Sequence, residues 1–222
     1  MTHFRLLATL GLITSLALPS VALAQSDPLV MPDRSEVEPG DAYVAEIFRD
    51  WQVRCIRSTA DEIPDRCEMF QLLEEENGNP VAEFRIAGVL EEVEGVIASA
   101  TILTPLDTLL SPGIQLQVDE NQPAQVPYAF CRPIGCFVQL TLTADDIAMF
   151  ESGVDAQVVL FALIRDDQGQ MGGAPVRLLA SLRGFTAAFD DVTARMETIR
   201  TFIAEQETSA PEEGETVSPV SE

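Results

Sequence analysis

Four cysteines in two close pairs, Cys55/Cys67 and Cys131/Cys136, restrict the fold of this chain more than any other feature of its sequence. An even number of cysteines in an exported protein predicts disulfides. We expect the local pairing, in which each bridge closes a short loop and contributes about 2–3 kcal/mol in the chain-entropy model. The crossed pairings stay open as alternatives if the two pairs meet in space.

The N-terminus predicts export. Arg5 precedes an apolar run over residues 6–18, and Ala22-Leu23-Ala24 is a small-x-small cleavage site. We therefore expect a signal peptide over residues 1–24 and a periplasmic or secreted mature protein. No later segment approaches the length of a transmembrane helix. The remaining chain divides into a flexible lead-in (25–42), a β domain (43–203) and a disordered acidic tail (204–222).

The charge is strongly one-sided, with 36 acidic and 13 basic residues and a net charge of −23. Such a field repels nucleic acid and anionic lipid, and it favours cationic partners or divalent ions. The sequence therefore predicts no nucleic-acid partner.

Two missing residue types limit the chemistry. The only histidine, His3, would leave with the signal peptide, and the chain contains no lysine. A mature protein without histidine has no Ser-His-Asp triad and no imidazole zinc ligand, and without lysine it forms no Schiff base. We therefore expect no enzymatic activity, no catalytic residue, and no metal or cofactor site.

The hydrophobic pattern is mainly that of β-strands. In residues 50–56, Trp51, Val53 and Cys55 alternate with polar residues, as in a half-buried strand. Further strands are predicted at residues 67–74, 81–91, 95–103, 113–119, 128–131, 136–142, 156–164 and 175–182. Residues 41–49 form a short helix or an extended segment, and residues 120–127 and 165–173 form loops.

Two helices complete the pattern. Thr143, followed by two aspartates, begins a short helix that Gly153 ends. A second helix follows Gly184 and carries an apolar stripe from Phe185 to Ile203. Together these elements predict an all-β, mainly antiparallel single domain, either a β-sandwich or barrel-like, with a short inserted helix and a C-terminal helix.

Two other functions deserve comparison with simple binding. Cys131 and Cys136 could form an envelope thiol–disulfide redox site, but four residues separate them rather than two, and no βαβ context surrounds them. Among the acidic runs, Asp166-Asp167-Gln168-Gly169 is the best candidate for a calcium site, although it does not match a calcium-loop motif. A structural disulfide and solvated turns are the simpler interpretations.

An ordered set of short motifs resembles the invasion-associated locus B (IalB) family of exported bacterial proteins. The resemblance runs from about Asp50 to Val192 and implies a single, mainly β domain that is exported, with no family catalytic residue to carry over. We therefore expect a non-enzymatic protein that binds another envelope or extracellular protein. The motifs are Trp51-x-Val53-x-Cys55, Cys67-x-Met69-x-Gln71, Gly113-x-x-Leu116-x-Val118-Asp119, Phe130-Cys131-x-x-x-Gly135-Cys136 and Ser181-Leu182-x-Gly184-Phe185.

Overall fold

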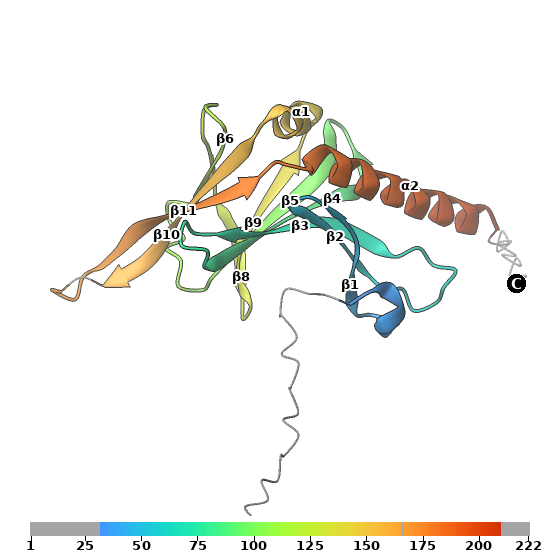
Figure 1. The fold of residues 1–222 in the computed structure, drawn as a ribbon, viewed down its shortest axis with the longest axis horizontal. Coiled ribbons are helices and arrows are strands. Elements are labelled where there is room, and N and C mark those ends of the chain that lie inside the picture. Colours follow the sequence, from blue (N-terminus) through green and yellow to red (C-terminus); the bar gives the residue numbers. More distant parts are fainter. Residues whose placement is uncertain (1–31, 166, 210–222) are drawn as a thin grey trace, which may run out of the picture. The chain divides into compact units, whose positions relative to one another are not determined.

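The structure is a computed structural model that describes residues 32–165 and 167–209. The predicted signal peptide and residues 210–222 of the predicted tail lie outside the described residues. The elements (Figure 1) are η1 (Arg34–Glu36), β1 (Ala42–Phe48), β2 (Trp51–Ile56), β3 (Arg66–Glu74), β4 (Pro80–Val93), β5 (Val96–Thr104), β6 (Ile114–Val118), β7 (Ala124–Val126), β8 (Tyr128–Arg132), β9 (Gly135–Leu142), α1 (Ala144–Ser152), β10 (Asp155–Arg165), β11 (Met171–Ser181) and α2 (Phe185–Ser209).

The strands form one antiparallel sheet that nearly closes on itself. Its order is β7-β6-β10-β11-β3-β4-β5-β9-β8, and β1 joins through β2, which pairs with β3. The two ends of this order, β7 and β8, are separated in sequence by Pro127 alone. The sheet is therefore barrel-like rather than a two-sheet sandwich, and the predicted all-β class is confirmed.

The inner face of the sheet forms the core. Trp51, Val53 and Cys55 are buried, as their alternation predicts, and Ile114, Leu116 and Val118 are buried in the same way on β6. Trp51 makes edge-to-face contacts with Phe84 and Phe185. Sheet and C-terminal helix thus share one core.

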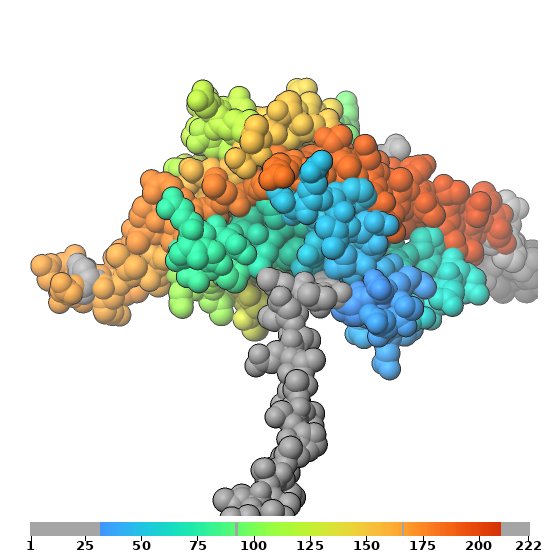
Figure 2. Space-filling model, in the orientation of Figure 1, coloured from blue at the N-terminus to red at the C-terminus, as the bar shows by residue number. Residues whose placement is uncertain are grey.

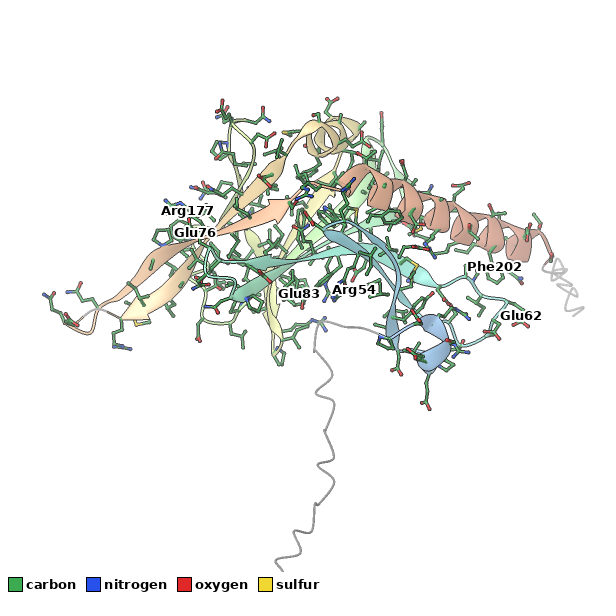
Figure 3. The ribbon with its side chains drawn as sticks, in the orientation of Figure 1. Arg54, Glu62, Glu76, Glu83, Arg177 and Phe202 are labelled. Carbon is green, nitrogen blue, oxygen red and sulfur yellow. A yellow bond between two sulfur atoms is a disulfide. The ribbon has the colours of Figure 1, made fainter. Side chains whose placement is uncertain are left out.

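Both predicted helices are present. The hydroxyl of Thr143 accepts a hydrogen bond from the Asp146 backbone N, and the Asp146 carboxylate accepts one from the Thr143 N, which forms a capping box at the start of α1. The apolar stripe of α2 packs against β2, β3 and β4. Near its end, Phe202 and Glu62 flank a shallow hollow between α2 and the loop before β3 (Figure 3).

The structure differs from the sequence-based expectation at several boundaries. Residues 42–48 form strand β1, paired with β2, in agreement with the extended alternative for that segment, and residues 124–126 form strand β7 where a loop was expected. Strand β11 begins at Met171 rather than at 175, so β10 and β11 make a long hairpin that projects in Figure 2. Helix α2 continues past Ile203 to Ser209.

Asp65 ties the segment before β1 to the domain. Its carboxylate accepts hydrogen bonds from Arg34 Nε (2.6 Å), Tyr43 Oη (2.5 Å) and the Ser58 backbone N (2.8 Å). Burial alone would raise the pKa of Asp65, but these hydrogen bonds hold the pKa well below its usual range. Burial and the same carboxylate raise the pKa of Tyr43 to about 12. Part of the expected flexible lead-in, around Arg34, is therefore packed against the domain.

We expect Asp65→Asn to lower the free energy of unfolding by about 2 kcal/mol at neutral pH, because three donors lose a charged acceptor. The folded-state pKa of Asp65 is depressed, so its contribution is complete above the unfolded-state pKa and is lost as the pH falls below about 4. Urea unfolding at several pH values should therefore show wild type and variant converging in acid. Asp61→Asn removes an exposed carboxylate that also contacts Arg34, and it is the control. If the difference in unfolding free energy between wild type and Asp65→Asn stays constant down to about pH 2, this assignment is contradicted.

Candidate binding site: a basic cleft between β3 and β4

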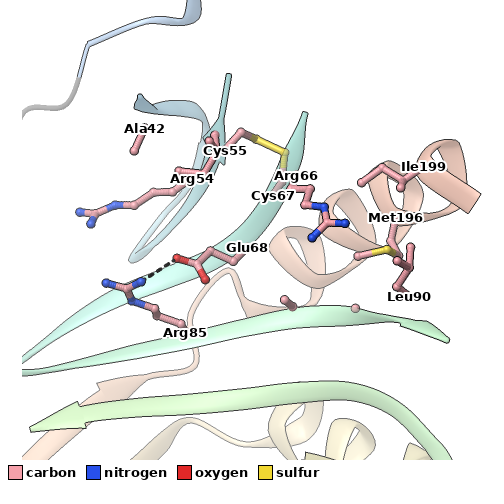
Figure 4. A pocket seen from close by; sticks show the side chains of 13 residues that line it. Ala42, Arg54, Cys55, Arg66, Cys67, Glu68, Arg85, Leu90, Met196 and Ile199 are labelled. Atoms are coloured by element: carbon pink, nitrogen blue, oxygen red, sulfur yellow. Dashed lines mark ion pairs between the residues drawn. A yellow bond between two sulfur atoms is a disulfide. The ribbon is translucent and has the colours of Figure 1, made fainter. Parts of the chain in front are cut away.

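The sheet splits where β3 and β4 separate. Their ladder runs from Glu74 to Met69, which pairs with Ile86. Beyond Met69, β3 stays paired with β2, while β4 stays paired with β5. The split opens a hollow of about 440 Å³ beside the Cys55–Cys67 disulfide (Figure 4).

Three arginines line this hollow, which we call the basic cleft: Arg54 on β2, Arg66 on β3 and Arg85 on β4. Because the chain carries a net charge of −23, a group of three cations is unusual on its surface. Charges more than about 10 Å away are largely screened at moderate ionic strength, so the nearby guanidinium groups dominate the local potential. The lining of the cleft therefore carries three guanidinium groups and one carboxylate, Glu68, which makes it a candidate site for an anionic ligand.

Arg54 is the cation best prepared for a ligand. Its guanidinium carbon lies 3.2 Å from the centroid of the Phe70 ring, and its Nε donates to Gln52 Oε1 at 3.0 Å. Among the described residues, no carboxylate lies within ion-pair distance of Arg54. Partial burial lowers its pKa, but a guanidinium remains charged at any relevant pH. Stacking fixes the group while leaving both terminal NH₂ groups able to donate.

Arg85, in contrast, is already paired. It contacts Glu68 at 3.3 Å and also pairs with Glu83. Burial raises the pKa of Glu68, and the charges of Arg85 and Arg54 oppose that rise. Arg85 is thus bound between two carboxylates, whereas Arg54 and Arg66 make no ion pair within the described residues.

The other wall of the cleft is apolar. Leu90, Met196 and Ile199 line it, and they lie opposite Arg54 and Glu68 in Figure 4. A second hollow, of about 750 Å³, shares Gly88 and Met196 with the first. We call this second hollow the apolar groove; Val93, Ile97, Phe189 and Met196 line it.

Both predicted local disulfides are present, and they lie in different parts of the sheet. Cys55 and Cys67 are opposite one another on β2 and β3 and are buried. Cys131 and Cys136 close the β8–β9 hairpin, where Cys131 is exposed. Crossed pairing, which the sequence left open, is therefore not what the structure contains.

The strongest sequence motifs build a structural junction rather than a reactive site. The Ser181 carbonyl accepts hydrogen bonds from Trp51 Nε1 (2.9 Å) and from Gln71 Nε2 (3.0 Å). Gly184 has a φ of +90°, and a Cβ at that position would collide with the Phe48 carbonyl oxygen. These residues join β2, β3 and β11 to the start of α2, which explains their types without any catalysis.

The carboxylates form no metal site in the described ranges, where no group of three or more His, Cys, Asp or Glu side chains is placed to hold an ion. The calcium candidate begins at Asp166, which lies outside the described residues. No helix of the described ranges has the length and apolar composition needed to cross a bilayer.

Sequence reasoning did not single out the basic cleft. Arg54 was placed on the polar side of its strand, but Phe70, Glu68 and Arg85 were not connected with it. The available signal was the alternation itself, since Arg54 and Arg85 both fall between inward-facing residues of predicted strands.

Comparison with known proteins agrees with the predicted resemblance. The family described as "Invasion associated locus B (IalB) protein" matches residues 51–193. Two invasion protein B homologs, from Brucella abortus strain 2308 and from B. abortus biovar 1 strain 9-941, are each 27% identical over 155 residues, which cover 70% of this chain and 82% of theirs.

A solved structure shares the fold. The crystal structure of invasion associated protein B from Bartonella henselae aligns with a TM-score of 0.53 and 21% identity, covering 68% of this chain and 97% of that one. The family match spans more than half of the sequence, including the motifs around both disulfides. The chain therefore belongs to the invasion associated locus B family.

Proposed function

We propose that this protein is an exported, non-enzymatic binding protein of the bacterial envelope or the extracellular space. It binds an acidic segment of another macromolecule, most simply a protein, at the basic cleft. The observation that carries the proposal is Arg54, which is stacked on Phe70, faces a hollow of about 440 Å³ and has no carboxylate partner among the described residues. Nucleic acid is not the proposed partner, because the net charge of −23 opposes binding of a long polyanion.

Export is supported by the leader-like N-terminus and by the two disulfides, which are stable in oxidising compartments. The related Brucella proteins are named invasion protein homologs, and the Bartonella structure is titled invasion associated. These names favour a role outside the cytoplasm, and they do not identify a binding partner. An intact N-terminus on protein recovered from the cytosol would contradict export.

A binding role also suits the chemistry of the cleft. General acid–base catalysis needs a group that gains and loses a proton near neutral pH. Arginine does not. The carboxylates Glu68 and Glu83 share one cation, Arg85, whose charge opposes the rise that burial gives the pKa of Glu68. Neither the thiol–disulfide alternative nor the calcium alternative is favoured by a specific observation.

The proposal predicts that Arg54→Ala disrupts partner capture in intact cells. A photoreactive residue in place of exposed Leu90, at the rim of the cleft, should form adducts of defined mass with the partner. Loss of a charge-assisted contact should reduce adduct yield about tenfold or more. The matched control is Arg177→Ala, which removes an exposed arginine from β11, away from the cleft. Equal adduct yields in the Arg54→Ala and Arg177→Ala backgrounds would rule out the cleft as the docking site.

A further inference from the structure

The basic cleft and the apolar groove meet. Both include Gly88 and Met196 in their walls. At Gly88 a Cβ atom would approach Met196 Cγ to 3.1 Å, so the missing side chain lets Met196 pack directly on β4 where the two hollows meet. The cationic hollow and the apolar hollow therefore lie side by side, one on each side of this contact.

The apolar end leaves large hydrophobic side chains in contact with solvent. Val93 is 55% exposed and Ile97 is 41% exposed, and both lie in the groove, while Leu90, at 39%, stands between groove and cleft. Exposed apolar side chains gathered around a hollow are typical of a ligand site, whereas isolated ones are ordinary. The charged residues of the groove are Glu94 and Arg200, and Arg200 is engaged with the Val89 carbonyl oxygen at 2.6 Å.

We propose that this combined site binds a single-chain carboxylate amphiphile of the fatty-acid type, with the head group at Arg54 and the hydrocarbon chain along the apolar groove. The inference rests on the proposed function only in taking the basic cleft to be a binding site. It adds a small ligand that carries a free carboxylate.

The chemical type of the head group is inferred from the arrangement of the arginines in the basic cleft. The two terminal NH₂ groups of a guanidinium match the two oxygens of a carboxylate. Arg54 is held in place by Phe70, and Arg66 offers a second charge with no ion-pair partner among the described residues. Glu68 faces the same hollow, and its negative charge penalises a dianionic phosphate more than a monoanionic carboxylate. A carboxylate is therefore the head group that fits.

The hydrocarbon part of the ligand is inferred from the size and lining of the apolar groove. A volume of about 750 Å³ exceeds what a twelve-carbon chain occupies, and the lining is predominantly aliphatic and aromatic. The protein's own C-terminal segment, residues 210–222, has no apolar run to match it, since Val217 and Val220 are its only large hydrophobic residues. We therefore assign the groove to an external hydrocarbon chain rather than to the C-terminal segment.

Calorimetric titration of the full exported protein with dodecanoate, below its micelle concentration, tests this inference. We expect saturable 1:1 binding with a Kd on the order of 10 μM. Octanoate, which is four methylenes shorter, should bind on the order of a hundredfold more weakly. Dodecanol, which lacks the charge, should bind about tenfold more weakly. Arg54→Ala should cost a similar factor. Ile97→Asp, which places a charge in the exposed groove, should weaken dodecanoate binding and leave the fold intact, while Arg177→Ala should change nothing.

Several results would overturn the inference. One is that dodecanol binds as tightly as dodecanoate. Another is that dodecyl phosphate binds as tightly as dodecanoate or more tightly. A third is that Arg54→Ala, or Ile97→Asp, leaves dodecanoate binding unchanged. Tight binding of a hexaglutamate peptide with no binding of dodecanoate would reject the amphiphile and leave the proposed macromolecular function standing. Equal adduct yields in the Arg54→Ala and Arg177→Ala backgrounds, with dodecanoate binding as expected, would reject the proposed function and not this inference. Circular dichroism of each variant separates lost binding from lost folding.

Discussion

Replacing Trp51 by alanine is expected to lower the free energy of unfolding by about 4 kcal/mol, a large part of the stability of a typical domain. The side chain is fully buried, and its ring centroid lies 5.7 Å from that of Phe84 and 5.5 Å from that of Phe185. Truncation would remove these contacts, open a cavity and leave the Ser181 carbonyl without one of its donors. Urea unfolding followed by far-UV circular dichroism measures the loss.

Trp51→Phe separates the contribution of aromatic packing from that of the hydrogen bond to the Ser181 carbonyl. Phenylalanine keeps an aromatic ring at the junction but cannot donate to Ser181, so a smaller loss of about 1–2 kcal/mol is expected. Arg177→Ala, at an exposed position, should leave stability nearly unchanged. If Trp51→Ala instead unfolds at the wild-type urea midpoint, the junction is not the centre of the core. A loss of binding without loss of stability would assign Trp51 to a ligand surface.

Elements whose burial alternates strictly could be predicted from sequence. Trp51, Val53 and Cys55 belong to such a run, and so do Ile114, Leu116 and Val118, because a period of two residues is a local property of the chain. The capping signal at Thr143 is local as well, and it placed α1 within a residue of its observed start. These elements required no knowledge of their neighbours.

The remaining strands depend on partners that are distant in sequence or on irregular pairing. Strand β1 pairs with β2 through a register shift between Val44 and Glu46, which hides its alternation. Strand β7 has three residues and is only partly buried, so nothing in its own composition distinguishes it from a loop. The start of β11 contains Gly172 and Gly173, which indicate a turn locally, yet both pair with β10.

The basic cleft was beyond sequence reasoning for the same physical reason. Arg54 and Arg85 lie on strands separated by β3, and only the observed registers place Arg54 beside Glu68, and Phe70 opposite Arg85. The opening itself arises because β4 follows β5 rather than β3 beyond Ile86. Register depends on the whole sheet, and a one-residue slip would turn Arg54 and Glu68 to opposite faces.

The two disulfides should contribute unequally to stability. Replacing Cys55 and Cys67 together by alanine is expected to cost about 4 kcal/mol. Their loop has a sequence separation of 12, which corresponds to about 3 kcal/mol of chain entropy, and loss of two buried sulfur atoms adds about 1 kcal/mol. Replacing Cys131 and Cys136 should cost about 2 kcal/mol, because their separation is 5 and Cys131 is exposed. Urea unfolding of both double variants measures the difference.

The same pair of variants tests whether the Cys55–Cys67 bridge shapes the binding site. This disulfide lies in the wall of the basic cleft, next to Arg54 and Arg66, whereas the Cys131–Cys136 bridge lies in the β8–β9 hairpin. Loss of the first bridge should therefore weaken adduct formation in cells even under conditions where the variant remains folded, and loss of the second should not. Equal adduct yields in both double variants would show that the Cys55–Cys67 bridge does not position the cleft. Greater destabilisation from the Cys131/Cys136 variant would contradict the expected order of stability. Because β3 is unpaired with β4 beyond Met69, Arg66 and Glu68 are held at the edge of the opening by the β2–β3 ladder, which the disulfide locks covalently.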